Sequence, residues 1–135
     1  MARAIIFHSL AHARAALGAA RESGVEVCLV TAPGAARYAG PDHLKKIIDL
    51  ALAEFEGEAP GVLIDCGENA GPAMSALRAG WKTLVFSGEP DVKRKIADMA
   101  AQRGARLVDR PVEALDLLDE PDPDAACRRW LSAPD

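Results

Sequence analysis

The sequence contains few aromatic residues and no long apolar run. Phe, Trp and Tyr make up 4% of its 135 residues, and much of the 50% hydrophobic fraction is alanine. The core is therefore expected to depend on Ile, Leu and Val side chains. His8, His12 and Arg14 interrupt the short apolar run near the N-terminus, which is typical of neither a secretory signal nor a membrane span. We expect a cytoplasmic protein without a membrane segment.

The sequence also lacks an excess of positive charge and has few cysteines. The formal net charge is -4 at pH 7, and no basic run is longer than Lys93-Arg94-Lys95. Binding to nucleic acid requires a positive surface that neutralises phosphates, so no nucleic-acid partner is expected. The 3 cysteines are an odd number, and no pair has the C-x-x-C spacing of a metal site. We therefore expect reduced thiols, no bound metal and a cytoplasmic chain of one domain by size.

Apolar runs rich in β-branched residues alternate with segments of helical periodicity. The runs cover residues 4–8, 25–31, 62–65, 83–86 and 106–109. They are nearly continuous rather than alternating, which is typical of strands covered on both faces. This order predicts a parallel sheet with right-handed crossovers. We expect an α/β fold, a flavodoxin-like three-layer sandwich with a five-stranded parallel sheet, because five strands are too few to close a barrel.

Helix signals lie between these strands. Ser9 is a candidate N-cap for a helix that ends before Gly24, and Pro41 begins a second helix with a clear amphipathic stripe. Two more helices are expected near residues 72–79 and 90–103, and another around 112–118. Residues 1–118 are thus predicted as one domain, followed by a linker and short helical tail over residues 119–135. Trp130 in this tail could contact the domain or a second copy, giving a homo-oligomer.

The most informative segment is Ile64–Gly71, where a buried strand ends in Asp-Cys-Gly before a glycine-containing turn. Ligands of α/β proteins usually bind at the carboxyl ends of strands, beside helix N-termini. Asp65 could bind a cation, orient a base or cap the following helix. Cys66 could be a nucleophile or a small semi-buried side chain. His8 could contact either one as an acid–base partner if strand one lies beside strand three. The candidate catalytic residues are His8, Asp65 and Cys66.

A loop of small residues at the same edge surrounds Arg37 and Tyr38. Its glycines allow a ligand to approach the backbone closely. The pair suits a carboxylate or phosphate, a partner surface, or a plain connector in which Tyr38 packs over the sheet end. No P-loop and no G-x-G-x-x-G pattern occurs, and no cofactor is expected. The candidate ligand-binding residues are Thr31, Gly34, Arg37, Tyr38, Gly67, Ser87 and Arg110.

Residues 61–118 resemble a response-regulator receiver domain. Asp65, Ser87 and Arg110-Pro111 occupy the places of the phosphoacceptor, the switch hydroxyl and the Lys-Pro pair. Receivers carry an acidic pair after strand one for Mg²⁺, whereas this chain has His8-Ser9 there. A metal that assists phosphoryl transfer to Asp65 would therefore have too few ligands.

Nearly the whole chain resembles a bacterial family of small α/β proteins with no assigned activity. The resemblance rests on four patterns: A-P-G-A-A-x-Y-A-G at 32–40, D-C-G-x-x-x-G-x-A at 65–73, A-L-R-A-G at 76–80 and A-x-x-x-G-A-R-L at 101–108. It implies a shared fold and supplies no chemistry.

Three functions remain open from the sequence. The first is a non-catalytic binding or regulatory module, with a small anionic ligand or protein partner at the strand carboxyl edge. The second is a small enzyme of the lyase, isomerase or hydrolase type that uses His8, Asp65 and Cys66. The third is a structural or oligomeric subunit that assembles through Trp81, Trp130 and the tail.

Overall fold

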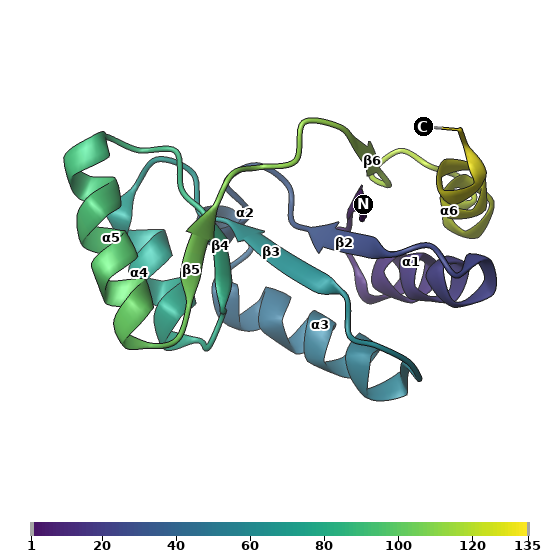
Figure 1. The fold of residues 1–135 in the computed structure, drawn as a ribbon, viewed down its shortest axis with the longest axis horizontal. Helices are drawn as coiled ribbons and strands as arrows, with labels where there is room; N and C mark the ends of the chain where they lie inside the picture. Colours follow the sequence, from purple (N-terminus) through teal and green to yellow (C-terminus); the bar gives the residue numbers. More distant parts are fainter. Residues whose placement is uncertain (1, 135) are drawn as a thin grey trace. The chain divides into compact units, whose positions relative to one another are not determined.

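The structure, a computed structural model, describes residues 2–134 and has the predicted α/β class with parallel strands (Figure 1). Along the chain the elements are β1 (Arg3–Ile6), α1 (Leu10–Ser23), β2 (Val27–Val30), α2 (Ala35–Tyr38), α3 (Pro41–Glu54), β3 (Gly61–Asp65), α4 (Ala70–Arg78), β4 (Thr83–Val85), α5 (Pro90–Gln102), β5 (Arg106–Val108), β6 (Ala114–Asp116) and α6 (Pro123–Ser132). Six strands are therefore found over the described range, one more than predicted.

The chain divides into two compact units. The first contains residues up to Val30, Ile47–Val62 and the residues from Pro111 onward. The second contains Thr31–Lys46 and Leu63–Arg110. The helix α3 and the strand β3 each contribute residues to both units.

In the first unit β1 lies between β2 and β6, and both pairings are parallel. Ile5 of β1 stands opposite Leu29 and Leu115, and the side chains of Ile5 and Leu29 are fully buried. The helices α1 and α6 contact each other, so they lie on the same face of these strands. The indole Nε1 of Trp130 in α6 donates a hydrogen bond to the Ala4 carbonyl at 3.1 Å.

The position of β1 corrects the prediction that strand one lies beside strand three. Both edges of β1 are already paired, one with β2 and the other with β6. The extra neighbour is a strand of three residues within the segment that was predicted as a helix around 112–118. The apolar spacing predicted a helix here wrongly, because Val112 and Leu118 are 101% and 60% exposed and do not form a buried helix face.

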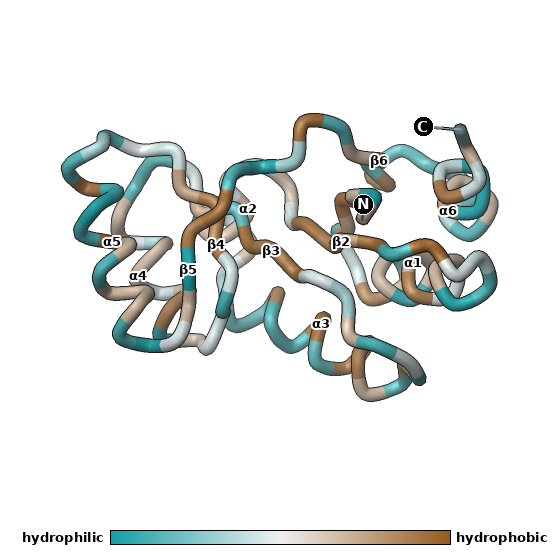
Figure 2. Tube along the Cα trace, viewed as in Figure 1, coloured by the Kyte–Doolittle hydropathy of each residue, from teal (hydrophilic) through white to brown (hydrophobic). Residues whose placement is uncertain are grey.

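In the second unit β3, β4 and β5 follow one another as parallel neighbours. Ile64, Leu84 and Leu107 stand opposite one another in register, and Ile64 and Leu84 are fully buried. The helices α4 and α5 contact each other, as expected when right-handed crossovers connect strands in sequential order. Figure 2 shows the hydrophobic character of β2 and β3 and the mixed hydropathy along α3.

Local signals determine most helix ends. The Ser9 hydroxyl caps α1 by accepting the N–H of His12 at 3.2 Å, and Gly24 ends that helix with φ 72°, as predicted. The predicted starts at Pro41 and Pro90 are confirmed, while α4 begins two residues before Pro72. In the part of the chain that is described, no helix is long and apolar enough to cross a membrane.

Candidate functional site

Asp65, at the carboxyl end of β3, is buried in the second unit with only 4% of its surface exposed. Its Oδ1 accepts the backbone N–H groups of Gly34 at 2.8 Å and Gly67 at 2.9 Å. Its Oδ2 accepts Nη1 of Arg110 at 2.8 Å. Three donors therefore compensate the burial of this carboxylate, which would be costly without them.

Thr31 completes this group, which we call the Asp65 cluster: Thr31, Gly34, Asp65, Gly67 and Arg110. The Thr31 hydroxyl accepts the N–H of Asp65 at 2.9 Å, and its carbonyl accepts Nη1 of Arg110 at 3.1 Å. Asp65 is the last residue of β3, and the other four come from the loops that follow β2, β3 and β5. The sequence prediction that these residues gather at one strand edge is correct for this set. Their polar groups bind mainly to one another.

Gly34 and Gly67 are required by backbone conformation. Their φ angles are 68° and 65°, in the left-handed region that costs other residues about 1–2 kcal/mol. A Cβ on Gly67 would lie 3.6 Å from the Gly34 Cα, which is an ordinary contact. The two glycines therefore serve to direct their N–H groups at Asp65.

Cys66 does not offer a reactive thiolate. Only 1% of Cys66 is exposed. This burial, and next to it the charge of Asp65, raises the pKa of the Cys66 thiol to about 12. The Sγ atom donates to the Ile64 carbonyl at 3.8 Å. At neutral pH this thiol is protonated and acts as a small core side chain.

His8 lies in the first unit, and its partner is Asp116 rather than the predicted Asp65 or Cys66. The distance from His8 Nε2 to Asp116 Oδ1 is 2.7 Å. Burial opposes ionisation of Asp116, but hydrogen bonds from His8 and from the Leu118 N–H lower the pKa of this carboxyl. His8 contacts Asp116 because β6, absent from the sequence prediction, ends beside β1.

His12 adjoins this pair. Its Nδ1 accepts the backbone N–H of His8 at 3.0 Å, and the two rings meet edge to face. Burial, followed by the charge of His8, lowers the pKa of His12. Sequence reasoning missed this cluster, although the four-residue spacing of His8 and His12 was a signal for it. Over residues 2–134 no group of three or more His, Cys, Asp or Glu is placed to hold a metal ion.

Arg37 and Tyr38 lie on the short helix α2, which follows Gly34. Both side chains are exposed, and 68% of Tyr38 is accessible to solvent. The interpretation in which Tyr38 packs over the sheet end is therefore wrong. The pair is fixed at its base by the Asp65 cluster, because Gly34 is the N-cap residue of α2.

Ser87 is exposed beside a hollow that sequence reasoning did not predict. Its backbone N–H donates to the Gly67 carbonyl at 2.8 Å, which connects the loop after β4 to the Asp65 cluster. The hollow has a volume of about 620 Å³ and is lined by Glu68, Asn69, Ala70, Ser87, Gly88, Glu89 and Val92. A Cβ on Gly88 would lie 2.6 Å from the Glu68 carbonyl oxygen, so this wall requires glycine.

Every predicted ligand-binding residue thus belongs to the second unit, but the roles differ. Thr31, Gly34, Gly67 and Arg110 hold the loops together, whereas Arg37, Tyr38 and Ser87 face solvent. No protein-family model and no curated protein matches the chain.

Proposed function

We propose that the chain is a non-catalytic binding module whose ligand presents a carboxylate or phosphate to the strand-end edge of the second unit. The observation that carries this proposal is the Asp65 cluster. It holds three loops together through a buried ion pair and two backbone N–H groups directed at one carboxylate. Loops that are fixed before binding lose less conformational entropy when a ligand arrives.

The chemistry of this edge supports binding rather than catalysis. Asp65 already accepts three hydrogen bonds, and the Cys66 thiol is protonated at neutral pH because its pKa is raised to about 12. A general base or nucleophile needs a free lone pair that can reach the substrate. Neither side chain can reach a substrate in this way, because Asp65 and Cys66 are only 4% and 1% exposed.

Arg37 and Tyr38 are the side chains proposed to contact the ligand. Among residues 2–134, Arg37 forms no ion pair, and its guanidinium can bind a carboxylate or phosphate through two parallel hydrogen bonds. The nearby hollow contains the carboxylates of Glu68 and Glu89, which repel an anion. The ligand is therefore expected on the α2 side of the edge.

The test is a titration followed by amide NMR, with small phosphorylated and dicarboxylate metabolites in one series and acidic or phosphorylated peptides in another. Binding should shift the amides of residues 34–38, and Arg37→Ala should abolish these shifts. Arg128→Ala, which removes an exposed arginine from α6, is the matched control. The proposal would be refuted if neither series shifted the amides, or if Arg37→Ala and Arg128→Ala reduced the shifts equally. Binding in the metabolite series would indicate a free small ligand, and binding in the peptide series would indicate a protein segment.

One observation favours a second candidate, a small lyase, isomerase or hydrolase. The 2.7 Å contact between His8 and Asp116 fixes an imidazole beside a carboxylate whose pKa is lowered. His8 would act as the general base and Asp116 would orient it, without Asp65 or Cys66. NMR profiling of a metabolite extract incubated with the chain tests this candidate. A conversion that His8→Ala abolishes and His43→Ala retains would support it, and no conversion by the wild-type chain would exclude it.

A further inference from the structure

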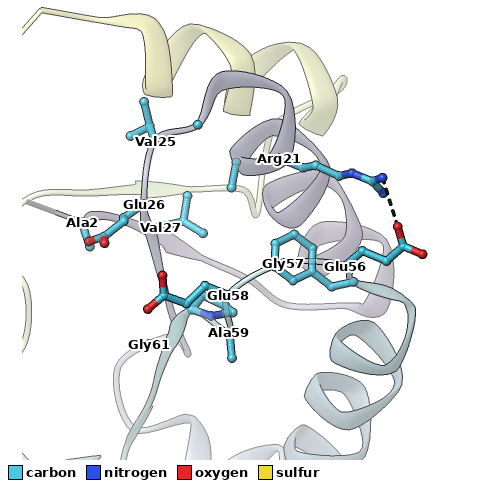
Figure 3. Close-up of a pocket in the computed structure, with 14 residues that line it drawn as sticks. Ala2, Arg21, Val25, Glu26, Val27, Glu56, Gly57, Glu58, Ala59 and Gly61 are labelled. Atoms are coloured by element: carbon cyan, nitrogen blue, oxygen red, sulfur yellow. Dashed lines mark hydrogen bonds and ion pairs between the residues drawn. The ribbon is translucent and has the colours of Figure 1, made fainter.

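A separate cavity lies in the first unit, beside the amino ends of its strands (Figure 3). Its volume is about 420 Å³, within the range of roughly 300–1,000 Å³ that is typical of small-molecule sites. The lining comes from Ala2, from residues 20–21 and 24–27 around the turn before β2, and from residues 55–61 before β3. None of these residues belongs to the Asp65 cluster.

Apolar groups form much of the cavity wall. Val25, Val27, Phe55 and Pro60 are among its lining residues, and Phe55 is partly exposed. Gly57 has φ 134°, and a Cβ there would lie 3.6 Å from the Phe55 ring. The loop therefore turns beside the ring, which leaves an aromatic surface at the site.

The charges around this apolar wall are mainly negative. Arg21 is paired with Glu56 at 3.3 Å. Figure 3 shows this pair on one side and the carboxylates of Glu26 and Glu58 on the other. Over the described range, neither Glu26 nor Glu58 has an ion-pair or hydrogen-bond partner through its side chain. An occupant that is apolar in its body and positive at one end would complement the apolar lining and the charge of the cavity.

We propose that this cavity binds a small organic cation, a primary amine with a compact apolar or aromatic body. Its body packs against Phe55 and the valines, and its ammonium group lies between Glu26 and Glu58. The cavity is open and its carboxylates are exposed, so water and salt screen the ion pairs and the binding is weak. This site is distinct from the proposed anion site in the second unit and has the opposite charge preference.

The experiment compares benzylamine with the neutral benzyl alcohol and the anionic phenylacetate in amide NMR titrations at pH 7. Benzylamine should shift the amides of residues 24–27 and 55–61, and the other two probes should bind at least about five-fold more weakly. The double substitution Glu26→Gln and Glu58→Gln should weaken the binding of benzylamine about three-fold to ten-fold, as expected for the loss of two exposed charges. Raising NaCl to 0.5 M should weaken it similarly.

Glu22→Gln is the matched control, because Glu22 is exposed on α1 and lies outside the cavity lining. It should leave benzylamine binding unchanged. Phe55→Leu removes the ring against which the apolar body packs, so it should weaken the binding of benzylamine and of benzyl alcohol to a similar extent. Three results would each overturn the proposal. They are equal binding of the three probes, a loss of benzylamine binding in Glu22→Gln as large as in the double variant, or an absence of amide shifts at residues 24–27. The amide spectrum of every variant without ligand shows whether the fold is intact.

Discussion

At the scale of single residues, Asp65 is the side chain on which most of the strand-end edge depends. Removing its carboxylate leaves Arg110 and two backbone N–H groups without their acceptor. Breaking a buried ion pair on one side typically costs about 3–5 kcal/mol. Because about a quarter of Arg110 remains accessible, with 26% exposure of its side chain, we expect the low end of this range.

The first prediction is that Asp65→Ala lowers the free energy of unfolding by about 3 kcal/mol. Asp65→Asn should cost less, because its amide oxygen still accepts the N–H groups of Gly34 and Gly67. Urea unfolding of the two variants and the wild type measures the difference. A loss in Asp65→Ala of less than about 0.5 kcal/mol, the range of ordinary surface changes, would show that the cluster is not structurally important.

The second prediction concerns the pH dependence caused by His12. Burial, followed by the charge of His8, lowers the pKa of His12 below its usual value of 6.5. The unfolded chain therefore binds more protons, so the free energy of unfolding decreases as pH falls through 6.5 towards the folded pKa. Protonation at Nδ1 would also break the bond that it accepts from the His8 N–H.

Chemical denaturation between pH 8 and pH 5 measures this dependence. His12→Asn retains an acceptor near Nδ1 but does not titrate, so it should flatten the curve. His43→Asn, at an exposed position of α3, is the matched substitution against which this flattening is judged. The lowered pKa of Asp116 affects stability only below its usual 3.8, outside this interval. An unchanged slope in His12→Asn would contradict the assignment.

At the scale of elements, local chemistry made the helices predictable. Ser9, Gly24, Pro41 and Pro90 act at the helix ends through their own backbone and side-chain geometry, and the structure confirms each one. The strand β6 was not predictable in this way, because its three residues are held by pairing with β1 more than one hundred residues earlier in the chain.

The same distinction between local and distant interactions applies to the candidate site. Its position at the end of β3 followed from the strand pattern alone, whereas its hydrogen bonds did not. Arg110 and Gly34 meet Asp65 only after three loops come together. The same holds for the contact of His8 with Asp116, which required a strand that the sequence pattern concealed.

The third prediction uses two glycines with opposite environments. Gly18 lies inside α1 with no atom within 4 Å of a built Cβ, so Gly18→Ala should stabilise the chain by about 0.5–1 kcal/mol. A Cβ on Gly88 would lie 2.6 Å from a carbonyl oxygen and from the Phe86 ring, so Gly88→Ala should destabilise it. Thermal unfolding of both variants measures the changes. Shifts of the same sign would contradict this description of the two backbone environments.

At the scale of the whole molecule, the two units depend on different parts of the chain. The helix α6 belongs to the first unit, where it contacts α1 and buries Ala126, Cys127 and Leu131. Trp130 of the same helix is hydrogen-bonded to Ala4 of β1. The C-terminal segment therefore contributes to the stability of the N-terminal strand.

The fourth prediction is that Trp130→Ala increases amide hydrogen exchange in β1, β2 and β6 more than in β3, β4 and β5. The substitution removes the indole contact with Ala4 and part of the packing of α6. Equal increases in both sets of strands would indicate a single cooperative unit.

Light scattering on the same variant tests the predicted homo-oligomer through Trp130, since a variant that keeps the mass of the wild type would remove Trp130 from that interface.

The central place of β1 in its sheet has a consequence for how the chain folds during synthesis. One neighbour of β1 is β2, which leaves the ribosome soon after it, but the other is β6, near the end of the chain. The strands β3, β4 and β5 lie within residues 61–108 and can pair while the rest is still being made. Among these six strands β1 is synthesised first, and yet it is among the last to gain both of its neighbours. Pairing over so long a sequence separation slows folding, and until β6 emerges one edge of β1 is open to pairing with other chains.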